Sequence, residues 1–277
     1  MKILENNQKL IDFLKNHRKK DLKIALIPTM GSIHKGHISL IDKANELGFY
    51  SLVTIFINPT QFNDSKDFDN YPRDKEKDLS LLINANTNLL FLPSIKDLYP
   101  DGVKSKKTIL DYRNILCDKF RPGHFDGVTT VIKSLFDLIN PDHLLMGEKD
   151  YQQLKLIQKV IEIDNLPIIL HYCVSIRMLN GMSFSSRYYN FNSSQKFLFD
   201  QSSKIIITNL KKLKEKIDHI YLDYIKEEFK KININKIDYI EVRNEITLLP
   251  TEKNKQARLF IAYYIDEIRI IDNFILY

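Results

Sequence analysis

The chain has 277 residues, of which 44% are hydrophobic and 27% are charged, and its formal net charge at pH 7 is +6. This balance is typical of a globular protein and excludes a disordered chain. No apolar run approaches the ~20 residues that a membrane-spanning helix needs, and the start at Met1 is too polar for a secretory signal. We therefore expect a cytoplasmic protein without a membrane partner.

The first 175 residues alternate between strand and helix patterns. Apolar runs predict strands at residues 23–27, 51–57, 88–92, 143–146 and 168–174. Amphipathic periodicity predicts helices at residues 4–18, 38–47, 74–83, 128–139 and 151–163. Strands that alternate with helices form parallel, doubly wound sheets, so we expect a Rossmann-like α/β domain.

A different pattern begins near Ile176. A polar loop at residues 180–194 is followed by amphipathic, lysine-rich helices around residues 204–231 and by short strands at residues 239–242 and 258–264. This part predicts a smaller α+β domain. We therefore expect two domains, at residues 1–175 and 176–277.

The most informative stretch is Leu-Ile-Pro-Thr-Met-Gly-Ser-Ile-His-Lys-Gly-His at residues 26–37. It predicts a strand, a turn and a helix start that carries His34 and His37. A helix N-terminus offers unpaired N–H groups and partial positive charge to a phosphate, and both imidazoles can reach the same anion. Gly31 and Gly36 let a nucleotide approach the backbone. The alternative is a surface helix that carries two histidines without a ligand.

Two further motifs suit a nucleotide. Gly-Glu-Lys-Asp at residues 147–150 follows a predicted strand, so Lys149 can meet a phosphate and Asp150 a ribose hydroxyl. Ser-Ser-Arg at residues 185–187 offers two hydroxyls and a guanidinium to an anion. Each motif also has a purely structural interpretation, the first as a helix cap and the second as a turn with a solvated arginine.

Residues 58–62 and 121–127 carry two other motifs. The first, Asn-Pro-Thr-Gln-Phe, ends a predicted strand with Gln61, whose amide can bind a small polar acid. The second, Arg-Pro-Gly-His-Phe-Asp-Gly, is turn-rich and is interpreted as a wall of the substrate site or as a simple connection. The chain contains neither GxxxxGK[ST] nor GxGxxG, so a kinase-type phosphate loop and dinucleotide binding are disfavoured.

The sequence leaves the protein ligands of any metal ion unknown. His34 and His37 have ligand-like spacing, but no carboxylate or cysteine completes a site. Cys117 and Cys173 lie far apart without CxxC spacing, which supports neither a zinc site nor a disulfide. We expect both cysteines to be small apolar residues.

Taken together, the motifs resemble the pantoate–beta-alanine ligase (pantothenate synthetase) family, within the wider HxGH superfamily of nucleotidylyl transferases. The matching stretches follow one another along nearly the whole chain, at residues 28–37, 57–62, 71–73, 121–128, 147–153, 185–187 and 239–242. The resemblance implies ATP-dependent condensation of (R)-pantoate with β-alanine through pantoyl adenylate, giving pantothenate, AMP and pyrophosphate. It also implies Mg²⁺ with the ATP, a C-terminal lid domain, and a homodimer formed through the first domain.

The resemblance carries over roles residue by residue. It implies four catalytic residues, His34, His37, Lys149 and Arg187, with His37 as the nominal proton donor. It implies that pantoate is bound by Gln61 and Gln153, and that Gln61 also meets β-alanine. The implied ATP-binding residues are Met30, Gly31, Ser32, Ile33, His34, Lys35, Gly36, His37, Gly147, Glu148, Lys149, Asp150, Ile176, Phe184, Ser185, Ser186 and Arg187.

Some positions depart from the family pattern. Ile33 and Phe184 are apolar exchanges, whereas Tyr188 replaces the usual asparagine and puts the form of the Ser-Ser-Arg loop in question. Lys77 stands in a stretch that is often acidic in relatives, so a Mg²⁺ ligand around Asp78 is not expected.

Two other functions stay open at this stage. A different HxGH transferase would use the same histidines without needing Gln61 and Gln153. An RNA-binding module would fit the positive charge, but the lysines are scattered and no aromatic stacking platform or RNA motif accompanies them. We therefore expect no nucleic-acid partner.

Overall fold

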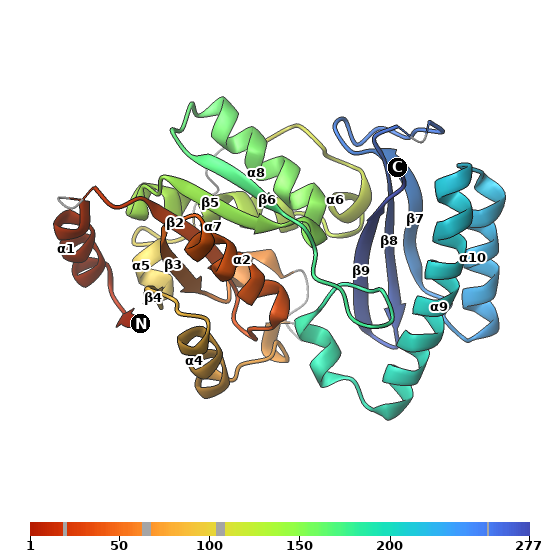
Figure 1. Ribbon diagram of the computed structural model, residues 1–277, viewed down its shortest axis with the longest axis horizontal. Coiled ribbons are helices and arrows are strands. Elements are labelled where there is room, and N and C mark those ends of the chain that lie inside the picture. Colours follow the sequence, from red (N-terminus) through yellow and green to blue (C-terminus); the bar gives the residue numbers. More distant parts are fainter. Residues whose placement is uncertain (19–20, 63–67, 104–108, 254) are drawn as a thin grey trace. The chain divides into compact units, whose positions relative to one another are not determined.

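The computed structural model describes residues 1–18, 21–62, 68–103, 109–253 and 255–277 (Figure 1). The chain divides into two compact units. The first comprises Met1–Arg113, Arg121–Glu148 and Gln153–Ser175. The second comprises Asn114–Phe120, Lys149–Gln152 and Ile176–Tyr277, so two short segments group with the C-terminal part of the chain.

In the described residues of the first unit, six strands form one sheet in which every pair is parallel. The strands are β1 (Lys2–Leu4), β2 (Ile24–Thr29), β3 (Tyr50–Ile55), β4 (Leu89–Phe91), β5 (His143–Gly147) and β6 (Ile169–Cys173). Their order across the sheet is β1-β4-β3-β2-β5-β6. The chain order reverses between β2 and β5, and ligands of such sheets bind beyond the carboxyl ends of the strands at that point.

Helices cover this sheet. They are α1 (Asn7–Arg18), α2 (Lys35–Glu46), α4 (Lys75–Asn84), α5 (Ile95–Leu98), α7 (His124–Ile139) and α8 (Tyr151–Ile163). Alternate strand residues such as Ala25, Ile27 and Val53 pack in one cluster with residues of α2 and α4. Leu26 and Leu52, which lie between them along the strands, are also fully buried. Both faces are therefore covered, as a parallel sheet requires.

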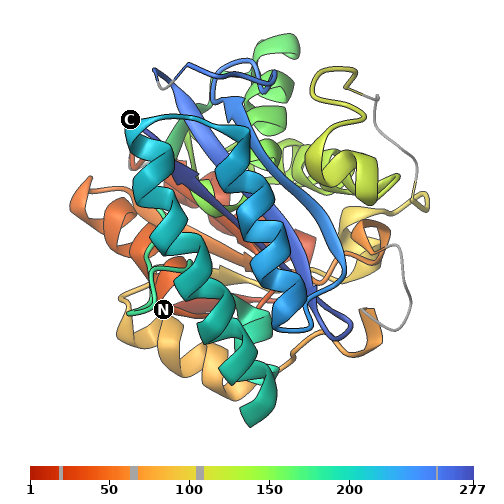
Figure 2. The same ribbon diagram turned by 90° about the vertical axis from the view of Figure 1, so that its right-hand side faces the viewer.

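The second unit is a small α+β structure. It contains α6 (Leu116–Phe120), α9 (Ser193–Glu215), α10 (His219–Lys231), β7 (Ile237–Asn244), β8 (Ala257–Ile265) and β9 (Ile268–Ile275). The three strands are antiparallel in the order β7-β8-β9. Figure 2 shows α9 and α10 lying side by side across one face of this sheet, where Phe199, Ile225 and Phe229 join its core.

The sequence-based prediction of the fold class is confirmed, but several boundaries differ. The helix predicted from residue 4 begins at Asn7, because Lys2–Leu4 forms the edge strand β1. Helix α7 begins at His124, inside the stretch predicted to be turn-rich, since Gly123 adopts a left-handed φ of 79° that ends the turn. Strand β9 is a further element that the sequence pattern does not predict. Within the described residues, no helix is long and apolar enough to cross a membrane.

Candidate functional site

The loop that follows β2 is held in an unusual backbone conformation. Gly31 and Ser32 both adopt left-handed φ angles, of 81° and 50°. The Thr29 hydroxyl accepts from the Gly31 N–H at 3.2 Å and donates to the Thr54 carbonyl at 2.8 Å. A Cβ at Gly31 would lie 3.0 Å from Asp78 Oδ2 and 3.1 Å from Ile55 Cγ2. The first glycine of the motif is therefore required by both conformation and space.

Asp78, a buried residue of α4, fixes this loop. Its Oδ2 accepts from the Ser32 N–H at 2.8 Å and its Oδ1 accepts from the Ile33 N–H at 2.6 Å. Burial raises the pKa of the Asp78 carboxyl, while the two backbone hydrogen bonds act in the opposite direction. Both carboxylate oxygens therefore serve the loop, a role that no sequence motif indicates.

His34 and His37 form a reciprocal cap at the start of α2. His34 Nδ1 accepts from the Gly36 N–H at 3.1 Å, and the His34 N–H donates to His37 Nδ1 at 3.4 Å. The two rings stack with their centroids 4.0 Å apart. Because each Nδ1 accepts a hydrogen bond, the proton of each neutral ring lies on Nε2. Each neutral ring therefore presents its Nε2–H as a hydrogen-bond donor, and neither histidine needs to be charged.

Gln61 belongs to the short 3-10 turn η1 (Pro59–Gln61) and is buried. Its backbone carbonyl accepts from His124 Nδ1 at 2.7 Å and from Arg121 Nη2 at 3.1 Å. A Cβ at Gly127 would lie only 2.3 Å from the Thr60 carbonyl oxygen, so α7 packs directly on this turn. The Arg-Pro-Gly-His-Phe-Asp-Gly motif therefore serves to hold Gln61 in place.

The motifs of the first unit share one edge of its sheet. Strands β2, β3 and β5 are neighbours and run in parallel, so the segments that follow them leave at the same edge. Those segments contain residues 30–37, Gln61 and Glu148, and Gly147 is the last residue of β5. Gln153, on α8, is grouped with the same unit and is partly exposed.

The remaining predicted residues lie in the second unit, where Lys149 is close to Arg187. Burial lowers the pKa of Lys149, the charges of Asp150 and Asp272 raise it, and the charge of Arg187 lowers it further. Ser185 caps the 3-10 turn η3 (Ser186–Asn190), its Oγ accepting from the Arg187 N–H at 3.3 Å. The charge of Arg187 therefore acts on Lys149 within this unit, and such a pair of cations suits phosphate binding.

Ile176 and Phe184 lie at the two ends of the loop before this turn. The Phe184 N–H donates to the Ile176 carbonyl at 3.3 Å, which brings the two residues together. Ile176 is 40% exposed and Phe184 is partly exposed, so both offer apolar surface beside Ser185–Arg187. Asp150 is exposed.

Comparison with known proteins decides the family. The family model described as pantoate–beta-alanine ligase matches residues 2–275. Pantothenate synthetase of Sulfurihydrogenibium sp. is 35% identical over 285 residues, covering 99% of each chain, and that of Wigglesworthia glossinidia brevipalpis is 36% identical over 289 residues, covering 99% of this chain and 98% of the relative. The chain belongs to the pantoate–beta-alanine ligase family.

Solved structures of such ligases have the same fold. The pantoate–beta-alanine ligase of Francisella tularensis, complexed with beta-gamma ATP and beta-alanine, is 34% identical with a TM-score of 0.86, covering 100% of this chain and 98% of that one. Pantothenate synthetase of Thermus thermophilus is 27% identical with a TM-score of 0.89, covering all of both chains. The similarity extends over both units, so this chain has the ligase fold throughout and the ligase activity of its family.

Tyr188, which stands where the family usually has asparagine, is a packing residue. Its ring lies 5.3 Å from that of Phe199 and 5.7 Å from that of Phe191, and it packs on the core of the second unit. The aromatic side chain thus anchors the end of the Ser-Ser-Arg loop to α9.

Cys117 differs from what the sequence suggests. Cys117 Sγ lies 3.0 Å from the Tyr239 hydroxyl and 3.6 Å from Arg269 Nη1, so the expectation of a purely apolar cysteine is wrong at this position. Buried Gln152 accepts from the Cys117 N–H at 2.9 Å and donates to the Ile115 carbonyl at 3.0 Å. Gln152 therefore ties α6 to the start of α8.

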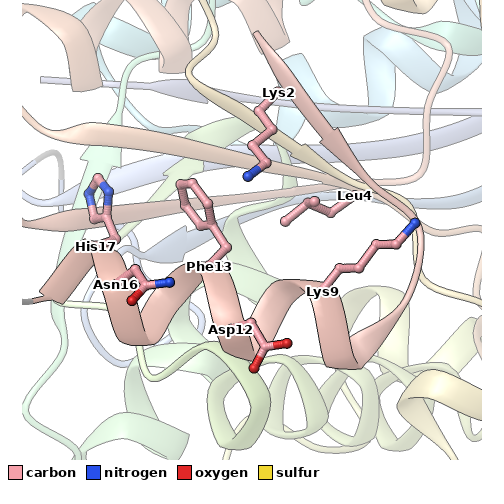
Figure 3. Close-up of a pocket in the computed structure, with 7 residues that line it drawn as sticks. All are labelled: Lys2, Leu4, Lys9, Asp12, Phe13, Asn16 and His17. Carbon is pink, nitrogen blue, oxygen red and sulfur yellow. The ribbon is translucent and has the colours of Figure 1, made fainter.

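In the described part of the chain, neither a group of metal ligands nor the hollow beside α1 and β1 adds to these motifs. Among the residues that the structure describes, no group of three or more histidines, cysteines or carboxylates could hold a metal ion. A hollow of about 430 Å³ lies beside α1 and β1, and the Lys2 ammonium there lies 4.6 Å from the centre of the Phe13 ring. Figure 3 shows the residues that line it. None of the residues lining this hollow belongs to a predicted site.

Proposed function

We propose that this ligase activates (R)-pantoate with ATP as pantoyl adenylate and then transfers the pantoyl group to β-alanine. The observation that carries the proposal is the family match over residues 2–275. It is supported by the pair of N–H donors that His34 and His37 present at the start of α2.

In the first step, a carboxylate oxygen of pantoate attacks the α-phosphorus of ATP. A new P–O bond forms as the bond to the bridging oxygen breaks, and the electron pair leaves with pyrophosphate. Neutral His34 and His37 donate hydrogen bonds to the phosphates, and Lys149 and Arg187 offset the charge that develops there. Most of the rate enhancement then comes from positioning and electrostatics.

The proposed binding residues follow the motifs. ATP contacts residues 30–37 and 147–150, together with Ile176 and residues 184–187. Gln61 and Gln153 hold pantoate, and Gln61 also meets β-alanine, since an amide can both donate to a carboxylate and accept from an amine. In the second step, the β-alanine amine attacks the activated carbonyl, AMP leaves, and the amine releases a proton.

The wider properties are proposals on the same basis. Residues 1–175 bind nucleotide and pantoate, and residues 176–277 form a lid that protects the adenylate from water. Mg²⁺ accompanies ATP as part of the substrate. The enzyme is a cytoplasmic homodimer, and light scattering gives its mass directly.

Pyrophosphate release tests the proposal. With ATP, Mg²⁺ and pantoate we expect one equivalent of pyrophosphate per enzyme, and continuous release with AMP and pantothenate once β-alanine is added. If no pyrophosphate is released with pantoate, or if the enzyme turns over with another acceptor, the result would point instead to a different HxGH transferase.

Substitution at the histidine pair gives the matched test. His37→Ala removes an N–H donor and should lower adenylate formation about 10²–10³-fold. His219→Ala changes a histidine at the surface of α10, 76% exposed, and should leave the rate unchanged. Equal rates in the two variants would refute the role of His37.

A further inference from the structure

Asp272 and Asn273 are adjacent residues of β9, and each is only 3% exposed. Buried polar side chains must be satisfied by hydrogen bonds, since an unsatisfied one is costly. Successive residues of a strand point to opposite faces, so this pair can reach two different segments of the chain. The contacts of the two side chains show which segments these are.

Asp272 holds the loop that leads into Ser-Ser-Arg. Its Oδ2 accepts from the Ser183 N–H at 2.7 Å and its Oδ1 accepts from the Ser183 hydroxyl at 2.7 Å. Arg177 Nη1, at the other end of the same loop, donates to Asp272 Oδ2 at 3.2 Å. Asp272 thereby closes the base of the loop two residues before Ser185.

Asn273 holds the segment that carries Lys149. Its Nδ2 donates to the Lys149 carbonyl at 2.8 Å, and its Oδ1 accepts from Arg258 Nη1 at 2.6 Å. The Arg258 guanidinium in turn lies 4.0 Å from the centre of the Tyr151 ring, at the start of α8. Strands β8 and β9 thus contact this segment at two residues, Lys149 and Tyr151.

We propose that Asp272 and Asn273 are positioning residues that set Lys149 and the 185–187 turn in one fixed arrangement for phosphate binding. Two cations must keep a defined separation to bind one polyphosphate, and a misplacement of about 1 Å can cost roughly a hundredfold in rate. A single two-residue anchor provides this separation for segments that lie far apart in the sequence. The inference rests on the proposed function, in which Lys149 and Arg187 contact ATP.

The first test is a double-mutant cycle on adenylate formation. With pantoate and β-alanine both present, Asn273→Ala should lower kcat for pyrophosphate release roughly tenfold to a hundredfold with a smaller change in KM for pantoate. In a Lys149→Ala background the same substitution should have little further effect, because its influence passes through Lys149. The control, Ser202→Ala, removes a buried hydrogen bond to the Tyr263 hydroxyl elsewhere in the same unit and should retain the wild-type kcat. Additive effects of Asn273→Ala and Lys149→Ala, or a wild-type kcat in Asn273→Ala, would overturn the inference.

The second test does not depend on any activity. Amide hydrogen exchange in Asn273→Ala should be roughly fivefold faster in peptides that cover residues 148–153, and in Asp272→Asn it should be faster at Ser183. Ser202→Ala should change neither region. If the wild-type chain is inactive with pantoate while exchange responds as expected, the proposed function fails and the anchor stands. If amide exchange is unchanged in both variants, the anchor itself is refuted. If Asn273→Ala does not fold, Asn273→Ser is used in its place.

Discussion

Lys149 loses its proton more readily than an ordinary lysine, because burial lowers its pKa by disfavouring the ammonium and Arg187 repels the charge. Asp150 and Asp272 oppose this shift without cancelling it. A phosphate-binding lysine acts only when charged. Its protonation therefore limits the alkaline range in which the proposed chemistry can occur.

We expect kcat/KM for ATP, measured with pantoate and β-alanine present, to fall at a pH below the ordinary pKa of a lysine. Because the pKa of Lys149 is lowered, activity is present below that pKa and is lost as pH rises through it. In Lys149→Arg the guanidinium stays charged, so the alkaline loss should move to higher pH even if the maximal rate falls. A pH–rate profile of pyrophosphate release checks this, and an identical alkaline limb in both proteins would assign it to another group.

The sequence predicts His34, His37, Lys149 and Arg187 because each stands in a short motif of recognisable chemistry. It does not predict Asp78, whose carboxylate binds amides 45 and 46 positions away. Nor does it predict Asn273, which binds the Lys149 carbonyl across 124 positions. Contacts of this range depend on how the elements pack, and a single sequence carries no local pattern for them.

At the scale of elements, the contact between α7 and η1 leaves no room for a side chain at Gly127. Gly127→Ala would place Cβ 2.3 Å from the Thr60 carbonyl oxygen, so the helix must shift and move Gln61 with the turn. We expect a loss of about 1–3 kcal/mol in the free energy of unfolding and a larger rise in KM for pantoate than for ATP. Ser134→Ala, further along α7, controls for mild changes in that helix. Equal changes in the two KM values would argue against a role for the turn in binding pantoate.

The pairing of β5 with β6 brings two histidines into contact, His143, which is buried, and His171, which is partly exposed. His171 Nε2 lies 3.1 Å from His143 Nδ1, and the Phe49 ring stacks on His143 with centroids 3.8 Å apart. Burial lowers the pKa of His143, with His171 adding to the effect, and burial with the charge of Lys43 lowers the pKa of His171. Asp142 raises the pKa of His143 but does not reverse the shift.

This pair makes stability depend on pH. Both rings are neutral above about pH 6.5 in the folded and unfolded chain, so stability is fully present there. As pH falls below that value, the unfolded chain binds protons that the folded chain does not, and stability decreases. We therefore expect a smaller free energy of unfolding at pH 5 than at pH 7. Denaturant unfolding at pH 5 and pH 7 measures it. In His171→Gln the decrease in the free energy of unfolding between pH 7 and pH 5 should be smaller. An unchanged decrease would exclude the histidine pair as its source.

Most of the elements follow from apolar runs and helical periodicity. Strands β1 and β9 do not, and there is a clear reason for each. Strand β1 has three residues and pairs only with β4, which is too short for a pattern to emerge. Strand β9 contains the buried pair Asp272 and Asn273, which interrupts the apolar alternation expected of a strand. The residues that we propose as an anchor are therefore the same ones that obscure the strand in the sequence pattern.

At the scale of the whole molecule, the proposed ATP-binding residues are divided between the two units. Residues 30–37, Gly147 and Glu148 group with the first unit, whereas Lys149, Asp150, Ile176 and residues 184–187 group with the second. The division into a nucleotide-binding domain at residues 1–175 and a lid at residues 176–277 stays a prediction. The C-terminal unit also includes residues 114–120 and 149–152, consistent with the hydrogen bonds of Gln152 and Asn273.

This division makes closure on ATP a testable requirement of the proposed mechanism. An acyl adenylate must be kept from water, and under the proposed function residues of both units contact ATP, so binding energy should favour a closed lid. Fluorophores at Gln8→Cys on α1 and Glu227→Cys on α10, both exposed positions, report the distance between the units in a Cys173→Ser background. We expect ATP with pantoate to narrow the distance distribution, and Arg187→Ala to abolish the narrowing by removing a phosphate contact. A distribution that stays unchanged while pyrophosphate is released would show that the chemistry proceeds without a lid, and protection of the adenylate would then have to come from residues fixed within each unit.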